Sequence, residues 1–216
     1  MATALPRTSP RVNYLNNRDI LKEIHLSKNT YCSFADRKTD HQYDIILPHV
    51  SKINLRTVAE ARRNRADRLK RETGEVVNEK TILKTDLVFR IMTFDHIPLN
   101  GIRKKNPKTL ADHRDKVNFP PFQHWKFDEN DELICVGKSH WKGTVDGGSF
   151  NKDHGRITEN LGKMYIKLSE RYAQRSNWRG YTYVEEMRGQ AVLQLSQIGL
   201  QFDESKSENP FAYYTA

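Results

Sequence analysis

The chain has 216 residues, of which 37% are hydrophobic and 29% are charged, and 36 Lys and Arg against 27 Asp and Glu give a formal charge of +9. This length allows one core, or one core with an insertion. The positive charge favours polyanionic partners such as nucleic acid, but it does not identify one. No apolar run approaches membrane-spanning length, so we expect no membrane contact and a cytoplasmic location. The two cysteines, Cys32 and Cys135, do not have a zinc-site spacing, and we expect neither a metal nor a cofactor.

The first 30 residues predict a polar tail followed by a short amphipathic helix. The stretch NRDILKEIHL, which begins at Asn17, places Ile20, Leu21 and Ile24 on one face. Residues 31–150 then lose regular periodicity and contain many turn residues. We interpret them as a basic, loop-rich α+β insertion of unknown function.

Three segments of this insertion carry structural signals. Residues 58–75 predict a helix that ends near Gly74. Between Arg56 and Arg71 there are seven Lys and Arg but two acidic residues. Either a solvated helix with intrahelical ion pairs or a helix that faces nucleic acid explains this composition. Further on, TDLVFRIMTF predicts a strand, and residues 124–143 predict a hairpin with an acidic tip at 128–131.

Residues 151–216 predict a helical domain with the best core of the chain. The stretch HGRITENLGKMYIKLSERYAQR has apolar residues at helical spacing, and a second helix is expected over 183–202 after the break SNWRGYTY. Two helices joined by a short turn form an antiparallel hairpin. Asn209 and Pro210 have the form of a third helix start. We therefore predict a mainly α fold.

The second helix of this hairpin carries a polar stripe. Its members recur at steps of three and four residues: Glu186, Gln190, Gln194, Gln197 and Gln201. An ordinary solvated face explains most such stripes. Solvated helices usually favour Lys and Glu, however, whereas amides suit a surface that forms hydrogen bonds to a docked protein. The stripe therefore favours a protein interface.

Three aromatic residues follow within one short segment. Phe211, Tyr213 and Tyr214 span most of a helix circumference, so at least one must face outward. Exposed aromatic side chains near cations can stack on unpaired bases, each contributing roughly 1–3 kcal/mol. Trp178 and Arg179, in the preceding turn, could add a further stack and a phosphate contact.

The order of these segments resembles a known family. An amphipathic helix, the turn WRGYTY, a Gln-rich helix that ends in LQFDESKSENPFAYYTA and an aromatic helix are similar to region 2 of bacterial sigma factors. The similarity is closer to the late-transcription sigma factors of T-even-like bacteriophages, and among them to the cyanophage type. The N-terminal VNYLNNRDIL also matches the opening of that family. The resemblance is specific over residues 151–216, weaker over 11–26, and leaves 31–150 as a family-specific insertion.

The resemblance implies a function for the matched residues. Glu186, Gln190, Gln194 and Gln197 would correspond to region 2.2, which binds the β′ clamp helices of the host RNA polymerase core. The aromatic helix would correspond to the start of region 2.3, which binds the unpaired strand of an A·T-rich −10-type promoter element. The chain would then be a late-transcription factor of the infected bacterial cytoplasm, without catalytic residues of its own.

The end of the chain departs from the family pattern. Further aromatic and basic residues that melt and read the promoter would lie beyond Ala216, as would a C-terminal tail that binds the phage sliding clamp. We therefore expect Ala216 to be the edge of an incomplete or trimmed gene product.

Two alternatives remain open from the sequence. Asp95-His96 after a strand and Asp112-His113 downstream loosely match a metal-dependent His-Asn-His nuclease, in which one histidine activates water and others bind the cation. Such sites need a hairpin followed by a helix, and proline-containing loops intervene here. A nucleic-acid-binding protein without polymerase contact would explain the charge but would give the Gln stripe no role.

Overall fold

The computed structural model describes residues 15–36, 39–101, 108–175 and 180–216. It is an α+β fold with 44% helix and 15% strand, so the predicted mainly α class is wrong. The described helices are α1 (Asn17–Asn29), α2 (Leu55–Thr73), α3 (Glu159–Ala173), α4 (Val184–Ile198) and α5 (Pro210–Thr215). The strands are β1 (Cys32–Phe34), β2 (Ile45–Leu47), β3 (Phe89–Met92), β4 (Phe122–Phe127), β5 (Leu133–Ser139), β6 (Trp141–Lys142) and β7 (Ser149–Phe150).

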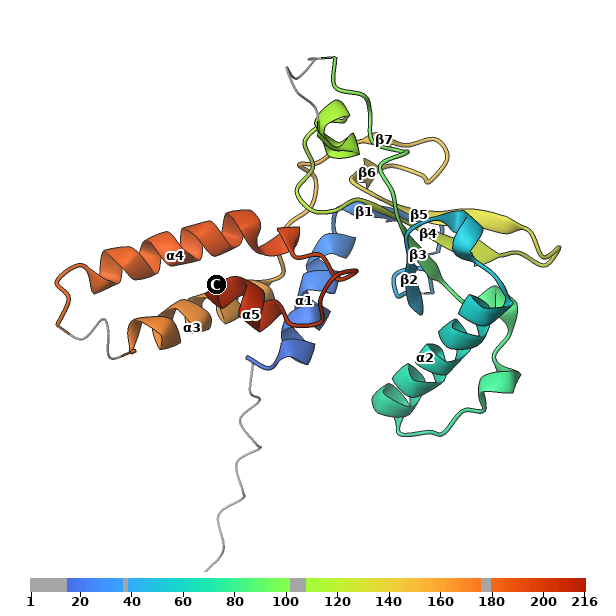
Figure 1. Ribbon diagram of the computed structural model, residues 1–216, viewed down its shortest axis with the longest axis horizontal. Coiled ribbons are helices and arrows are strands. Elements are labelled where there is room, and N and C mark those ends of the chain that lie inside the picture. Colours follow the sequence, from blue (N-terminus) through green and yellow to red (C-terminus); the bar gives the residue numbers. More distant parts are fainter. Residues whose placement is uncertain (1–14, 37–38, 102–107, 176–179) are drawn as a thin grey trace, which may run out of the picture.

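A five-stranded mixed sheet occupies the middle of the molecule, with the strand order β1-β5-β4-β3-β2 (Figure 1). Strands β2 and β3 are parallel, and the other pairs are antiparallel. The connection from β2 to β3 contains α2, as the crossover between parallel strands requires. The short strands β6 and β7 form a separate ladder.

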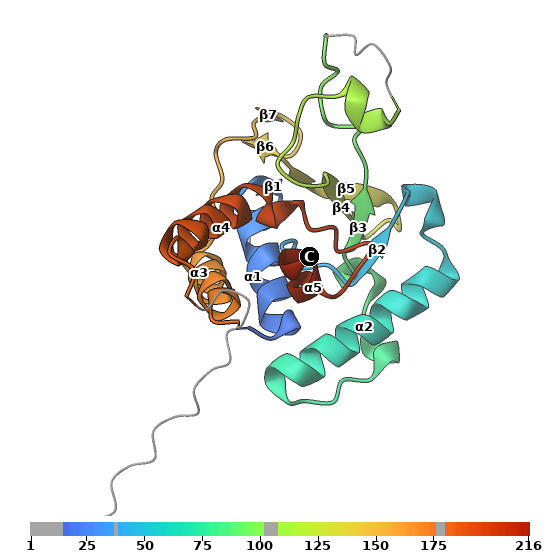
Figure 2. The same cartoon turned by 60° about the vertical axis from the view of Figure 1, so that its left-hand side comes forward.

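The helices form two groups, which lie on different sides of the five-stranded sheet. Helices α3, α4 and α5 gather around α1, whereas α2 lies apart from them (Figures 1 and 2). The core of the first group joins Ile20 and Ile24 of α1 to apolar residues of α3 and to Phe119 and Phe122. Phe119 precedes β4, and Phe122 is the first residue of that strand. The core of the helices therefore includes side chains from the part of the chain that forms the sheet.

A second core lies between α2 and the sheet. Val58, Ala61 and Ala66 of α2 pack with Ile45 and Phe89 of the strands. The helix begins at an Asn54 capping box and ends at Gly74, whose φ of 79° is the left-handed conformation that favours glycine. The predicted end of this helix is therefore confirmed.

The other predicted elements are confirmed with shifted boundaries. The strand expected over 85–94 is shorter, because residues 84–86 form a 3-10 turn before β3. The hairpin expected over 124–143 is formed by β4 and β5, which pair in antiparallel register. Both helices of the C-terminal hairpin and the third helix form. Strands β1 and β2 have three residues each and carry no clear pattern, so the sheet as a whole was not predicted.

A buried group of charged and imidazole side chains, here called the charged cluster, joins the sheet to the helices. Its members are His25, Lys28, Arg90, His124 and Glu204. The Arg90 guanidinium lies between the rings of Tyr43 and Phe122, 3.9 and 3.8 Å from their centroids. Lys28 Nζ lies 2.9 Å and Arg90 Nη1 lies 3.4 Å from the same oxygen, Glu204 Oε2. One carboxylate therefore balances two buried cations.

Two histidines complete the hydrogen bonds of Arg90. Its Nε donates to His124 Nε2 at 3.0 Å, and Nη2 lies 3.1 Å from His25 Nδ1. Because a guanidinium can only donate, both imidazoles accept and must be neutral. Burial, with the nearby Arg90 charge as a second cause, holds the pKa of both histidines well below 6.5. The hydrogen bonds of Arg90 in the charged cluster therefore require both histidines to be uncharged.

This arrangement predicts loss of stability in mild acid. The unfolded chain takes up protons near the ordinary histidine pKa of about 6.5, whereas the folded cluster cannot. The stability is therefore present above that pH and falls as the pH decreases toward the folded-state pKa values. We expect a decrease of about 1.4 kcal/mol per histidine between pH 7.5 and 5.5, measured by urea unfolding.

A His124→Gln variant should weaken this pH dependence, because its amide still offers Arg90 an acceptor but does not titrate. The exposed His113 supplies the control, and His113→Gln should leave the dependence unchanged. Equal stability of the unmodified protein at the two pH values would contradict the assignment of neutral histidines.

Candidate interaction surface

A groove with a volume of about 460 Å³ lies between α3, α4 and α5. Its lining is mostly apolar, with Leu168 from α3, Leu195 and Ile198 from α4, and Tyr213 from α5. The side chains of Gln190 and Gln194 also line it. The hairpin of α3 and α4 extends away from the sheet, so its outer faces are not covered by the rest of the described chain (Figures 1 and 2).

Helix α4 is the least buried part of this surface. Leu195 is its one buried residue, whereas Met187 and Ile198 are 37% and 42% exposed. Residues 189–201 contain no Asp, Glu, Lys or Arg, although 29% of the chain is charged. An exposed surface with apolar side chains and without charge is typical of a protein interaction site.

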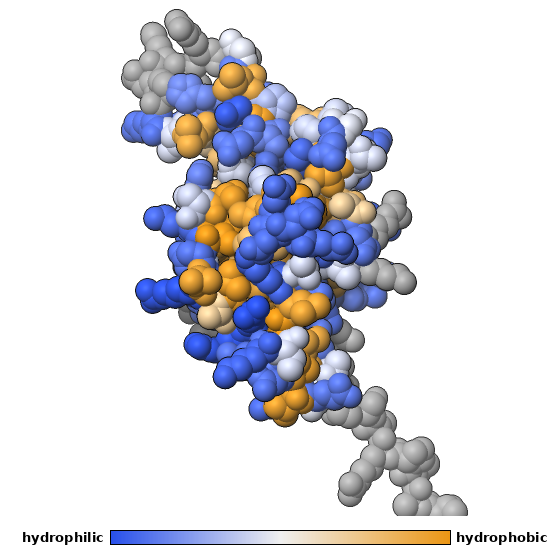
Figure 3. Space-filling model, turned by 90° about the vertical axis from the view of Figure 1, so that its right-hand side faces the viewer, coloured by the Kyte–Doolittle hydropathy of each residue, from blue (hydrophilic) through white to orange (hydrophobic). Residues whose placement is uncertain are grey.

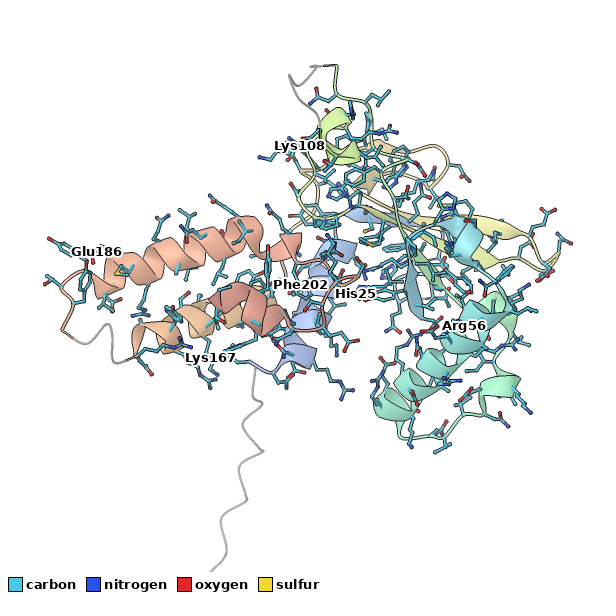
Figure 4. All side chains as sticks on the ribbon, viewed as in Figure 1. His25, Arg56, Lys108, Lys167, Glu186 and Phe202 are labelled. Carbon is cyan, nitrogen blue, oxygen red and sulfur yellow. The ribbon has the colours of Figure 1, made fainter. Side chains whose placement is uncertain are left out.

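The residues of the predicted polar stripe lie in different surroundings on this helix. Gln190 and Gln194 line the groove beside the apolar side chains. Glu186 and Gln197 are exposed but do not line the groove. Figure 4 shows Glu186 near the far end of the hairpin, away from Phe202 and His25. The four residues therefore do not form one compact site.

The three aromatic residues of α5 have different environments. Phe211 and Tyr213 are 36% and 39% exposed. Tyr214 instead packs inward, with its ring centroid 5.3 Å from that of Tyr165. Its hydroxyl donates to the Gly199 carbonyl at 2.8 Å and lies 3.2 Å from Tyr165 Oη. Of the three α5 rings that were predicted to bind DNA, two are thus accessible, and the third is part of the helical packing. Trp178 and Arg179 lie outside the described residues.

Sequence reasoning predicted the two helices of the hairpin but did not identify the groove beside them. Tyr172, Met187 and Ile198 are each partly exposed along its sides. Their helical spacing is the same as that of truly buried positions. The uncharged run over 189–201 was the available signal, since a solvated helix of this length would normally carry Lys or Glu.

The basic helix α2 has a mostly balanced outer face. Arg65 and Arg68 turn inward and pair with the buried Asp44, with N–O distances of 3.4 and 2.7 Å. The exposed cations between residues 56 and 71 are Arg56, Arg63, Lys70 and Arg71, and Glu60 and Asp67 lie among them. Alternating charge of this kind is typical of a solvated helix face. Arg63 Nε lies 3.8 Å from Glu79 Oε1, so this ion pair, like those to Asp44, joins α2 to another part of the chain. Figure 3 shows this side, with hydrophilic and hydrophobic side chains interspersed.

His96, the first of the two histidines in the nuclease alternative, has a polar partner at each of its ring nitrogens. His96 Nε2 lies 3.0 Å from the Ser139 carbonyl oxygen, and Nδ1 lies 3.2 Å from Gln123 Nε2. Burial lowers the pKa of His96 to about 4. Asp112 accepts hydrogen bonds from the backbone of Lys108 and Thr109. Among the residues that the structure describes, no group of three or more His, Cys, Asp and Glu could hold a metal ion. The arrangement therefore does not favour that chemistry.

A second, more polar hollow of about 380 Å³ lies at the C-terminal end of α1, beside β1 and β6. Cys32 and His154 line it. Burial raises the pKa of the Cys32 thiol to about 12, and its Sγ lies 3.2 Å from the Lys28 carbonyl oxygen. Cys32 is therefore a protonated thiol and a poor nucleophile.

No protein-family model, curated protein or solved structure matches the chain. Within the described residues, no helix combines the length and the apolar composition that a bilayer crossing requires.

The Tyr214 hydroxyl predicts a measurable contribution to stability. Tyr214→Phe removes the bond to Gly199 and the contact with Tyr165, and should lower the free energy of unfolding by about 1 kcal/mol. Urea unfolding measures this change. The control is Tyr183→Phe, since Tyr183 is exposed at the start of α4. If the two variants are equally stable, Tyr214 does not fix α5 through its hydroxyl.

Proposed function

We propose that this chain is a sigma-type transcription factor of the late phage kind, which binds a bacterial host RNA polymerase core and unpaired promoter DNA. The observation that carries the proposal is the uncharged, exposed surface of α4 next to a short aromatic helix. This surface comes from the same segments that resemble sigma region 2. It supports a function by association with other macromolecules.

The polymerase contact would use α4. Gln190 and Gln194 lie beside Met187 and Ile198, so a docked protein would cover apolar area and find amide donors and acceptors at the same place. Glu186 and Gln197 would extend the contact around the helix. By the resemblance, the partner is the pair of clamp helices of the β′ subunit.

The promoter contact would use α5. Phe211 and Tyr213 are accessible enough for bases of an unpaired A·T-rich −10-type element to stack on them. Stacking would offset part of the cost of separating the strands. Tyr214 would contribute indirectly, by fixing the helix that carries the other two rings. Binding of a phage sliding clamp through a further C-terminal tail, and action in the infected host cytoplasm, belong to the same proposal.

The test is binding of the full chain to purified cyanobacterial RNA polymerase core. Replacing both groove amides in Gln190→Ala/Gln194→Ala should weaken binding about tenfold, or ~1.4 kcal/mol, because the docked surface loses its directional hydrogen bonds. The measurement is a core titration with a fluorescently labelled chain.

Ser196→Ala is the matched control, since Ser196 is exposed on α4 but does not line the groove. It should bind the core as the unmodified chain does. Absence of core binding by the unmodified chain would reject the proposed function, and equal binding by the double variant would reject this face of α4.

A further inference from the structure

The charged cluster lies against the turn that leads into α5. Lys28 Nζ donates to the Phe202 carbonyl oxygen at 2.7 Å as well as to Glu204. Arg90, which contacts the same carboxylate, belongs to β3 of the sheet. The turn at residues 202–209 is thus bound to both α1 and the sheet.

Helix α5 needs such support because it has six residues. Helices of this length are not stable by themselves in water. Three contacts outside its own ladder fix it: Asn209 caps its first turn, Asn17 Oδ1 accepts from the Phe211 N–H at 3.1 Å, and Tyr214 bonds to Gly199. The direction in which the chain enters the helix is set by the preceding turn.

The position of α5 in turn determines the groove. Tyr213 and Tyr214 line one of its sides, and α3 and α4 provide the others. The ring of Tyr213 also lies 5.5 Å from that of Phe202, the residue whose carbonyl oxygen binds Lys28. A displacement of the turn would therefore move both the wall of the groove and an exposed aromatic ring.

We propose that Arg90, Lys28 and Glu204 are positioning residues for this interaction surface. Through them, the sheet fixes the turn and α5 in the place where the groove forms. This inference rests on the proposed function of the groove. It gives residues 31–150 a role in partner binding that does not require them to touch the partner.

A competing explanation is that the turn fixes itself. Asp203 Oδ1 accepts from the Ser205 backbone N–H at 3.0 Å, and Asp203 pairs with Lys206 at 3.2 Å. If these local bonds were sufficient, the charge of Glu204 would have no effect on α5. The two explanations therefore differ in what a change at Glu204 does to that helix.

The experiment compares Glu204→Gln with Glu208→Gln, an exposed carboxylate in the same turn. Hydrogen exchange of the Phe211, Ala212 and Tyr213 amides reports on α5, and core titration reports on binding. Glu204→Gln removes the one carboxylate charge that contacts both buried cations, so it should lower α5 protection and core affinity at least tenfold. Glu208→Gln should change neither.

A second variant distinguishes a local loss of α5 from unfolding of the whole chain. Lys28→Met/Glu204→Leu removes one charge of each sign and therefore keeps the formal charge of the cluster, and it leaves Arg90 no side-chain acceptor at position 204. It should fold, as judged by protected sheet amides, and it should lose α5 protection. Unchanged α5 protection in the folded variants would overturn the inference. If the unmodified chain does not bind core while Glu204→Gln still loses α5 protection, the positioning role stands and the proposed polymerase partner fails.

Discussion

The structure depends on one buried carboxylate that faces two cations. Glu204 compensates for Lys28 and Arg90, whose side chains are almost fully excluded from solvent. Removing one partner of a buried ion pair typically costs about 3–5 kcal/mol, because the remaining charge is left without compensation. Here the three residues come from α1, β3 and the C-terminal turn, which are distant in sequence. The cluster therefore makes the sheet, the helices and the end of the chain depend on one another.

Because of this dependence, the rest of the fold holds the candidate interaction surface in place through the turn that leads into α5. The groove has α3, whose Leu161 and Leu168 belong to the core, and α4 as two of its walls, and α5 as a short third wall. A wall that is already held by core packing suits a binding surface, because less conformational entropy is lost when a partner docks. The uncharged face of α4 and the exposed rings of α5 then lie close enough for one partner complex to contact both.

The sequence predicted the individual helices well and the assembly poorly. Periodic apolar positions such as Leu161 and Leu168 identified α3, and Gly74 identified the end of α2, because these signals are local. Strands β1 and β2 are too short for a periodic signal, and Arg90 and Lys28 have the composition of surface residues although they are buried. Their partner, Glu204, lies more than a hundred residues from Arg90. No local pattern reports such a contact. Among the site residues, helix geometry required that at least one of the three aromatic rings face outward, whereas the exposure of Phe211 and Tyr213 and the inward position of Tyr214 depended on tertiary packing.

Cooperative unfolding of sheet and helices tests the central claim most directly. In a Trp178→Phe variant, the remaining tryptophans, Trp125 and Trp141, lie in β4 and β6 and report on the strands, while far-ultraviolet circular dichroism reports mainly on the helices. We predict that urea transitions followed by the two signals have the same midpoint and slope, since the charged cluster couples both parts. Two separated transitions, with the helical signal persisting after the tryptophan signal has changed, would contradict this account.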